Sequence, residues 1–134
     1  MNFVYERQIN YYETDKMGVV HHSNYIRYLE EARCKWLEEL GIPYDKFEEN
    51  GIMIPVLEVR CEHKYHVTFG DTIRINLKIK KYTGVRLEVE YEITNVKDNK
   101  LVFLGETKHC FTNTDLKPVN LKKYNIEFSN KFEE

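Results

Sequence analysis

The stretch "TIRINLKIKKYTGVRLEVEYEI", Thr72 to Ile93, alternates apolar and polar residues on both sides of a turn that contains Gly84. Apolar residues occupy positions 73, 75, 77 and 79, and apolar or aromatic ones occupy 85, 87, 89, 91 and 93. Successive side chains of a strand point to opposite faces of its sheet. The stretch therefore predicts two antiparallel strands, one face buried and the other charged and exposed to water.

Three further segments show the residue types of strands. They are 3–12, 52–65 and 101–112, and the last follows a turn, "KDNK", at 97–100. Pro55 interrupts the second segment, which places its first part at a sheet edge or a bulge. Together with the central pair, these segments predict about five strands.

One long helix separates the first strand from the others. In "NYIRYLEEARCKWLEEL", Asn24 to Leu40, apolar residues recur at three- and four-residue steps. Ser23 or Asn24 can cap its start, and Gly41 followed by Pro43 ends it. A short helix at 44–49 can follow, with Pro43 at its first position.

No helices separate the later strands, so the order favours an α+β fold over an α/β fold. A single helix that covers the apolar face of about five strands requires a sheet that curls round it. We expect one domain over residues 1–134, with a charged tail at about 116–134 that has no clear pattern.

The composition excludes several classes of function. A net charge of −2, from 20 basic and 22 acidic residues, gives no electrostatic basis for binding nucleic acid or an anionic membrane. No apolar run reaches the roughly 20 residues of a membrane-spanning helix, and we expect no stable membrane insertion. Three widely spaced cysteines indicate reduced thiols and a cytoplasmic protein.

The loop before the helix, "ETDKMGVVHHSNY" at 13–25, carries the most chemistry in the chain. A Ser-His-Asp triad requires one ring to reach both a serine and a carboxylate. Because His22 and Ser23 are neighbours at a helix start, their side chains should point apart, so Ser23 fits a helix cap better. Adjacent histidines, and a second pair at 63 and 66 on opposite strand faces, do not make a metal site either.

What remains in this loop is a carboxylate, a glycine turn and a helix N-terminus. The first N–H groups of a helix are unpaired and carry partial positive charge, which suits a developing oxyanion. Asp15 lies upstream in a loop that Gly18 allows to fold back. These groups are sufficient to hydrolyse a thioester, since a thiolate leaves without a strong general acid.

The segment "QINYYETDKMGVVHHSNY", Gln8 to Tyr25, resembles the signature of the 4-hydroxybenzoyl-CoA thioesterase family of hot-dog-fold enzymes. Ten fixed positions match: Gln8, Ile9, Thr14, Asp15, Gly18, Val19, Val20, His21, Asn24 and Tyr25. The following "YLEEARCKWLEELG" is similar to the central helix of small bacterial acyl-CoA thioesterases of the Tol-Pal-cluster type. The likeness covers about residues 3–115 and leaves the tail outside it.

The resemblance implies a hot-dog fold and an acyl-CoA thioesterase. It gives Asp15 the role of nucleophile or general base, and it gives the backbone N–H at His22 the role of polarising the thioester carbonyl. Coenzyme A enters only as part of the substrate, and no metal or other cofactor is expected. Substrate contacts are expected from the remaining motif positions and their neighbours, Gly18, Val20, His21, Ser23 and Tyr25, with Tyr12 as a further pocket residue.

One feature departs from the benzoyl-specific enzyme. Its basic cluster for coenzyme A phosphates is reduced here to "KKYTGVR", so Lys81 and Arg86, with Lys80, are the only candidates for that contact. Preference for an aromatic acyl group is therefore not inherited. Another branch of the family places its carboxylate on the central helix, where Glu30 and Glu31 are secondary candidates.

Two alternatives remain open within the hot-dog fold. One is a non-catalytic protein that binds acyl-CoA or an acyl carrier, in which Asp15 would be dispensable. The other is an enoyl-CoA hydratase, which the absence of an Asn-Pro between the aspartate and the histidine disfavours. Hot-dog subunits pair to extend their sheets, so the resemblance implies a homodimer or homotetramer.

Overall fold

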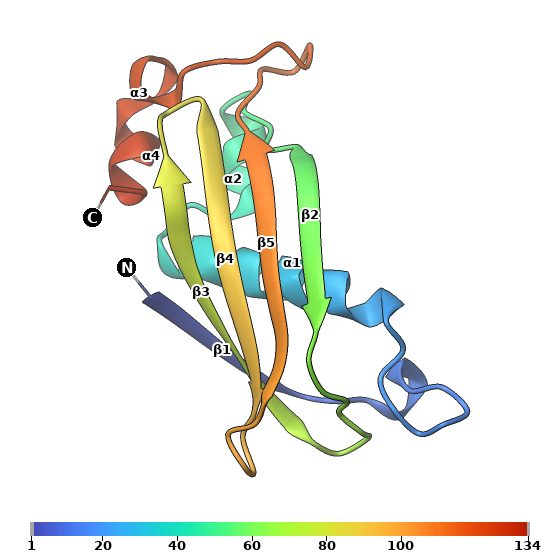
Figure 1. Ribbon diagram of the computed structural model, residues 1–134. Helices are drawn as coiled ribbons and strands as arrows, with labels where there is room; N and C mark the ends of the chain where they lie inside the picture. Colours follow the sequence, from blue (N-terminus) through green and yellow to red (C-terminus); the bar gives the residue numbers. More distant parts are fainter. Residues whose placement is uncertain (1, 134) are drawn as a thin grey trace.

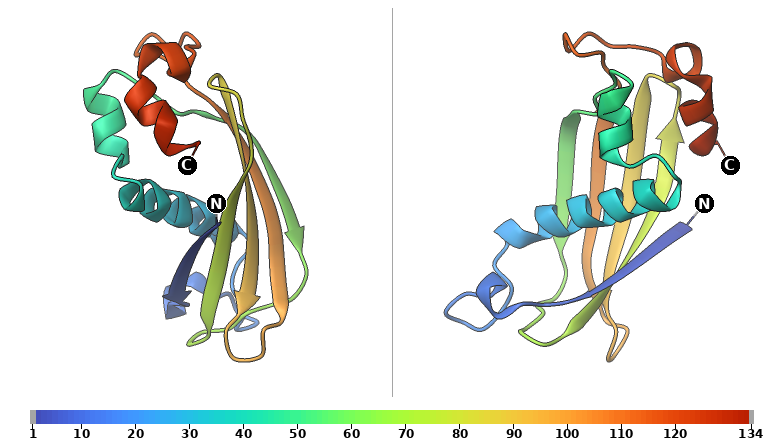
Figure 2. Two further views of the ribbon diagram at one scale, coloured as in Figure 1. Left: turned by 90° about the vertical axis from the view of Figure 1, so that its left-hand side faces the viewer. Right: turned by 180° about the vertical axis from the view of Figure 1, so that it is seen from behind.

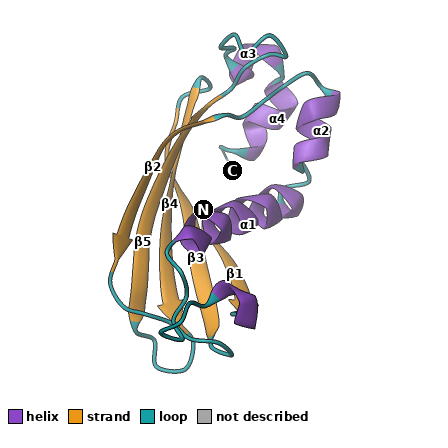
Figure 3. Cartoon of the chain, turned by 90° about the vertical axis from the view of Figure 1, so that its right-hand side faces the viewer, coloured by secondary structure: helices purple, strands orange, loops and turns teal. Residues whose placement is uncertain are grey.

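The computed structural model describes residues 2–133 as one five-stranded antiparallel sheet with all helices on one of its faces (Figure 1, Figure 3). The sheet order is β1-β3-β4-β5-β2. In chain order the elements are β1 (Asn2–Gln8), the 3-10 turn η1 (Tyr11–Glu13), α1 (Ser23–Glu39), α2 (Tyr44–Glu49), β2 (Val56–His63), β3 (Thr72–Tyr82), β4 (Arg86–Asn95), β5 (Leu101–Cys110), α3 (Leu121–Tyr124) and α4 (Ile126–Lys131).

The alternating stretch forms β3 and β4 in the register that its pattern predicts. Ile75 pairs with Ile93 and Leu77 with Tyr91, and these four residues are at most 2% exposed. The alternate residues point to the outer face, where Lys78 Nζ lies 3.6 Å from a carboxylate oxygen of Glu90. The expected α+β fold, a curved antiparallel sheet round one long helix, is confirmed.

The long helix α1 lies across the apolar face of the sheet. Its own residues Tyr28, Leu29 and Ala32 are completely buried. Gly105 of β5 permits this close packing, because a Cβ there would lie 3.0 Å from Leu29 Cδ1. The first turn of α1 projects past the edge of β2, as Figure 1 and the view from behind in Figure 2 both show.

Several details of the elements differ from the sequence prediction. The first strand ends at Gln8 rather than at residue 12, because Tyr11–Glu13 forms a 3-10 turn in which the Glu13 carboxylate accepts the Asn10 N–H. The strand expected from 52 begins at Val56, directly after Pro55. The prediction of a Ser23 or Asn24 cap is wrong: His22 occupies the N-cap position, and its side chain makes no cap hydrogen bond.

The C-terminal tail is structured rather than patternless. It forms α3 and α4, and Phe128 and Phe132 pack into the core. The Phe128 ring meets Phe47 of α2 edge-on at 5.0 Å, and Phe132 lies 5.6 Å from Trp36 of α1. These aromatic contacts close the core at the end of α1 that lies farthest from the Asp15 loop.

A buried ion-pair cluster joins β1, η1 and α1. Arg7 donates through Nη2 to the Glu13 carboxylate and through Nη1 to both carboxylate oxygens of Glu31, at 2.7 and 2.9 Å. The side chains of Arg7 and Glu13 are only 11% and 7% exposed. The guanidinium carbon also lies 4.4 Å from the centre of the Tyr28 ring. One cation thereby fixes the segment that leads to Asp15 against both the sheet and the helix.

A chain of polar groups crosses the core between α1 and the sheet. Arg33 donates to the Tyr91 hydroxyl at 3.2 Å, and that hydroxyl shares a hydrogen bond with Thr107 at 2.6 Å. Thr107 in turn contacts His109 Nε2 at 2.8 Å. Burial and the nearby Arg33 guanidinium lower the pKa of His109 to about 4. His109 is therefore neutral in the folded protein at neutral pH.

Loss of Arg7 should destabilise the fold strongly. Arg7→Leu leaves the buried Glu13 carboxylate without its partner, which costs about 3 to 5 kcal/mol in the free energy of unfolding. The matched control is Arg74→Leu, because Arg74 makes a 2.7 Å pair with Glu6 that is far more exposed; its loss should cost at most about 1 kcal/mol. Urea unfolding of both variants measures the difference. Equal effects would contradict a structural role for the Arg7 cluster.

The stability of the protein should fall between pH 6.5 and pH 5 because of His109. The unfolded chain binds a proton on this histidine near pH 6.5, whereas the folded chain does so only near its pKa of about 4. The folded state accordingly loses roughly 2 kcal/mol relative to the unfolded state by pH 5. Urea unfolding at several pH values should show a shallower fall in His109→Gln. An unchanged slope in that variant would exclude His109 as the cause.

Candidate active site

The Asp15 loop is a short hairpin that folds back onto its own chain. Thr14 forms an isolated β-bridge with Val20, and the Asp15 N–H donates to the Val19 carbonyl at 2.9 Å. Gly18 sits in the turn with a φ of +78°, a conformation that L side chains rarely adopt. The hairpin therefore needs a glycine at this position, as the sequence motif suggested.

The start of α1 is bound to the same hairpin. The Glu13 carbonyl accepts two hydrogen bonds, from the His21 N–H and from the Asn24 side-chain amide, each at 2.9 Å. The Glu13 carbonyl thereby ties the start of α1 to the hairpin that carries Asp15.

Two groups at this site have unused hydrogen-bonding capacity. The N–H groups of Ser23, Asn24 and Tyr25 donate to His21 Nδ1, to the His21 carbonyl and to the His22 carbonyl. Among residues 2–133, none accepts a hydrogen bond from the His22 N–H. Asp15 Oδ1 accepts the Met17 N–H at 2.8 Å, while its Oδ2 has no partner among these residues. A free donor and a free carboxylate oxygen thus occupy one loop.

The histidine that contacts the serine is His21 rather than His22. Its Nδ1 lies 2.8 Å from Ser23 Oγ, and its ring lies 4.2 Å from that of His22. No carboxylate of the described chain is bonded to the His21 ring, and Asp15 bonds the loop backbone instead. The contact therefore lacks the third member that orients the base in a triad.

Two predicted substrate contacts are core residues in the single chain. Val20 is 6% exposed, and its N–H donates to the Val67 carbonyl. Tyr25 is 4% exposed and stacks on Phe103, with ring centres 5.0 Å apart. The exposed His63 of β2 meets both rings edge-on. This aromatic cluster lies directly below the first turn of α1.

The predicted coenzyme A contacts are not part of this group. Lys81 and Arg86 flank the β3–β4 turn, and the Leu121 N–H of the C-terminal segment bonds to Gly84 in that turn. The Asp15 loop lies at the other end of the sheet (Figure 1). β3 alone, with 11 residues, separates the two ends by roughly 30 Å. The structure does not bring Lys81 or Arg86 to Asp15 within one chain.

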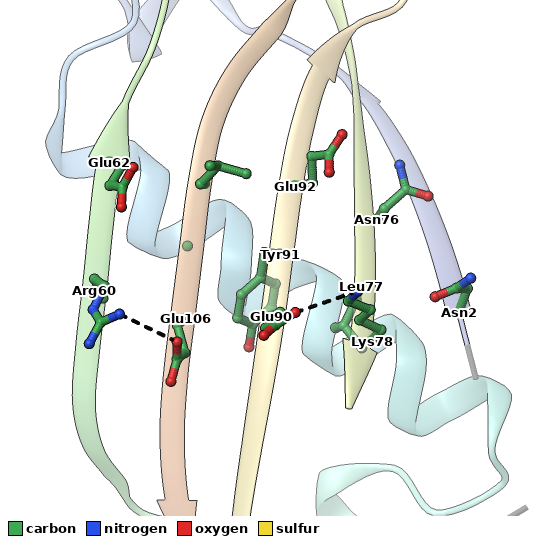
Figure 4. A pocket seen from close by; sticks show the side chains of 12 residues that line it. Asn2, Arg60, Glu62, Asn76, Leu77, Lys78, Glu90, Tyr91, Glu92 and Glu106 are labelled. Carbon is green, nitrogen blue, oxygen red and sulfur yellow. Dashed lines mark ion pairs between the residues drawn. The ribbon is translucent and has the colours of Figure 1, made fainter. Parts of the chain in front are cut away.

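A cavity lies elsewhere, on the outer face of the sheet. Its volume is about 490 Å³, and Figure 4 shows charged side chains of β2, β3, β4 and β5 around it, including Arg60, Glu62, Lys78, Glu90 and Glu106. None of the predicted site residues lines it. The Asp15 loop lies instead beside the first turn of α1, which projects past the edge of β2.

Residues 2–133 contain neither a cluster of metal ligands nor a membrane-spanning helix. No three His, Cys, Asp or Glu side chains there are grouped so as to hold a metal ion. None of the helices in that range combines the length and apolar character of a membrane span.

Sequence reasoning missed the residues that hold the loop in place. Glu13, Arg7 and the Asn24 amide fix the loop, but their partners lie 6 to 24 residues away along the chain. The one available signal was a glutamate, Glu13, placed three residues after Asn10 as in a capping box. The 3-10 turn that follows Asn10 carries this arrangement.

Comparison with known proteins identifies the family. Residues 9–127 match the model of the thioesterase-like superfamily, so the likeness extends into the tail, beyond the expected limit near residue 115. A putative esterase of Aquifex aeolicus is 36% identical over 110 residues, covering 82% of this chain and 84% of its own. A putative acyl-CoA thioesterase, YneP, of Bacillus subtilis is 28% identical over 118 residues, covering 88% and 86%.

A solved structure agrees with these relatives. The DHNA-CoA thioesterase of Staphylococcus aureus superposes with a TM-score of 0.92 at 30% identity, covering 98% of this chain and 89% of its own. The chain therefore belongs to the thioesterase-like superfamily of hot-dog proteins and is an enzyme of the thioester-hydrolase type.

Proposed function

We propose that this protein hydrolyses an acyl-CoA to the free acid and coenzyme A at the Asp15 loop. The observation that carries the proposal is that, among residues 2–133, neither the His22 N–H nor Asp15 Oδ2 has a hydrogen-bond partner, and both lie in one loop. In thioester hydrolysis, negative charge develops on the carbonyl oxygen. The N–H can stabilise that charge, and the carboxylate can act as nucleophile or base. The superfamily membership supports the same reaction.

In the proposed mechanism, the thioester carbonyl accepts a hydrogen bond from the His22 N–H at the helix start. Asp15 either takes a proton from a water that attacks the carbonyl carbon or attacks that carbon itself to form an acyl-aspartate. In both routes the carbonyl oxygen becomes an oxyanion that the N–H stabilises. Collapse of this intermediate breaks the carbon–sulfur bond and releases the coenzyme A thiolate, which takes up a proton; water then hydrolyses an acyl-aspartate where one forms.

Gly18, His21, Ser23 and Tyr25 are proposed to shape the substrate site around these two groups, with Val20 supporting it from the core. His21 and Ser23 are exposed beside the helix start, where they can contact the thioester or the pantetheine arm. Lys81 and Arg86 contact coenzyme A in this proposal only if another subunit presents them. Coenzyme A is substrate, and no separate cofactor takes part.

We also propose a homodimer or homotetramer in the cytoplasm. The eight residues of β2 are all exposed at the sheet edge, and the Asp15 loop overhangs that edge. The free thiols of Cys34, Cys61 and Cys110 are consistent with a reducing compartment. Within the superfamily, we assign the chain to the branch that resembles the 4-hydroxybenzoyl-CoA and Tol-Pal-cluster thioesterases, on the Gln8–Tyr25 motif.

The sequence left open a protein that binds acyl-CoA or an acyl carrier without hydrolysing it, which the thioesterase relatives disfavour. Binding needs the same overhang and the same helix start, but it does not need the Asp15 carboxylate. An enoyl-CoA hydratase is less well supported, because the loop has no Asn-Pro between Asp15 and the histidines.

Asp15→Asn should lower the release of free thiol from acyl-CoA substrates by at least about a hundredfold, because the amide is neither a nucleophile nor a base. The measurement is a thiol-release assay over short, long and aromatic acyl-CoAs. Asp45→Asn, at an exposed position of α2, is the control and should keep wild-type rates. Full activity of Asp15→Asn would exclude this mechanism. Binding of acyl-CoA by an inactive wild-type protein would instead favour the alternative.

A pair of substitutions at His22 should separate the ring from the backbone. His22→Ala keeps the N–H and should retain a substantial part of kcat. His22→Pro removes the N–H as well as the ring, and the native φ of −56° suits proline. Loss of one oxyanion donor should lower kcat about 100- to 1000-fold. Thermal unfolding of both variants checks that the fold persists. Equal losses in the two variants would show that the ring is essential.

A further inference from the structure

The outer face of the sheet, opposite to the helices, carries a cavity that the proposed reaction does not use (Figure 4). Its volume of about 490 Å³ lies within the roughly 300 to 1,000 Å³ of small-molecule sites. Acidic side chains outnumber basic ones in its lining, so a cation fits there better than an anion. The charged lining residues are Arg60, Glu62, Lys78, Glu90, Glu92 and Glu106.

The most buried carboxylate of this lining has an unused oxygen. Glu106 lies on β5 and is only 7% exposed. Its Oε2 accepts a hydrogen bond from Lys80 Nζ at 3.1 Å and lies 3.8 Å from Arg60 Nη1. Its Oε1 is buried, and no group of residues 2–133 donates a hydrogen bond to it. A buried carboxylate oxygen without a donor is unfavourable, so a bound donor would stabilise the site at this atom.

Two carboxylates of β4 add negative charge beside Glu106. Glu90 lies directly opposite Glu106 in the β4–β5 register, and like charges in that position destabilise a sheet. Lys78 Nζ offsets the charge of Glu90 at 3.6 Å. Glu92 lies diagonally across from Glu106, about 7 to 8 Å away at the backbone. Within residues 2–133, its carboxylate has neither an ion pair nor a hydrogen bond. Glu92 and Glu106 Oε1 are therefore the two unused acceptors.

The geometry of these acceptors selects the chemical class of the cation. A metal ion does not fit, because the described residues 2–133 contain no group of three His, Cys, Asp or Glu side chains that could hold one. A guanidinium prefers two parallel hydrogen bonds to one carboxylate, whereas Glu106 has a single unused oxygen. An ammonium group is a compact charge with three donors, and one oxygen is enough to bind it.

The separation of the acceptors fits more than one ammonium group. A chain of three or four carbons holds two ammonium nitrogens about 5 to 6 Å apart. Such a spacing lets one nitrogen reach Glu106 while the next reaches Glu92, because both glutamate side chains can turn. We infer that this cavity binds a linear polyamine, with one ammonium group on Glu106 Oε1 and another on Glu92.

The ligand reaches Glu106 by displacing a side chain at the surface. Arg60 and Lys80 cover Glu106, and their side chains are 60% and 43% exposed. Exposed side chains change rotamer within nanoseconds. The Arg60 contact is the weaker of the two, since 3.8 Å is too long for a hydrogen bond. The ammonium group therefore takes the place of Arg60 beside Glu106, while Lys80 keeps its hydrogen bond to Oε2.

This site is independent of the proposed function. The cavity lies on the outer face of the sheet, whereas α1 and the Asp15 loop lie on or beyond the other face (Figure 1). Asp15→Asn should therefore bind a polyamine with the wild-type Kd, whatever its effect on thiol release. A protein that hydrolyses acyl-CoA but binds no polyamine contradicts only this inference, and the reverse result contradicts only the enzymatic proposal.

Calorimetric titration of the whole protein with spermidine, a linear triamine, tests the site. Glu106→Gln should weaken binding at least about tenfold, because it removes the charged acceptor of a hydrogen bond. Glu92→Gln should weaken it about two- to fivefold, as expected for an exposed ion pair. Glu6→Gln is the matched control, since it changes the net charge equally, lies outside the cavity and should bind as the wild type does.

Thermal unfolding checks that these variants fold. Glu92 is exposed, so Glu92→Gln provides a result even where Glu106→Gln is unstable. No binding of spermidine by the wild type, or a Glu92→Gln variant that binds as tightly as Glu6→Gln, would overturn the inference.

Removal of the competing cation should have the opposite effect. Arg60→Gln leaves the space beside Glu106 free and should tighten spermidine binding about two- to fivefold. Arg74→Gln is its control, because Arg74 is paired with Glu6 outside the cavity, and it should leave the Kd unchanged. Weaker binding by Arg60→Gln would contradict the placement of the ammonium group.

The choice of ligand tests the chemistry of recognition. Putrescine and n-butylamine share one carbon chain, but putrescine carries a second ammonium group and should bind about two- to fivefold more tightly. Mg²⁺ has the same charge as putrescine and should not displace spermidine at an equal concentration. Equal binding of the two amines, or displacement by Mg²⁺, would show only diffuse attraction to a negative surface and would overturn the polyamine site.

Discussion

The position of the candidate site depends on one buried cation. Arg7 lies on β1, yet its guanidinium bonds to Glu13 at the start of the loop and to Glu31 on α1. The Glu13 carbonyl then receives the His21 N–H and the Asn24 amide. Through these contacts the sheet, the loop and the helix start share one point. They add to the Thr14–Val20 bridge in fixing the Asp15 loop relative to the start of α1.

The parts of the fold that could be predicted from the sequence are those with a regular period. The pattern of β3 and β4 has a period of two, and its register follows directly. The pattern of α1 has the period of a helix, and its predicted limits differ from the structure by one residue at each end. The Asp15–Gly18 turn could also be predicted, because only glycine readily takes the φ of +78° found at Gly18.

The parts that could not be predicted depend on contacts between distant residues. Glu13 is buried only because Arg7 pairs with it, and a glutamate in a polar loop gives no sign of this. Two short helices that break at Asn125 form the tail, and Phe128 and Phe132 are buried through contacts with the distant rings of Phe47 and Trp36. The predicted side-chain cap of α1 is wrong for a similar reason. The Asn24 side-chain amide donates to the Glu13 carbonyl, and Ser23 Oγ is hydrogen-bonded to His21 Nδ1.

The packing of α1 also determines where an acyl group can lie. Gly105 brings the helix so close to β5 that even a Cβ there would crowd Leu29 and Phe103. At the far end of α1, the rings of Phe47, Phe128 and Phe132 fill the space between the helices and the sheet. The middle and the far end of the helix are therefore closed to a substrate. The first turn is different, because it extends past β2 over an exposed apolar row. In the proposed mechanism, an acyl group bonded to the His22 N–H would therefore extend toward the β2 side of the helix.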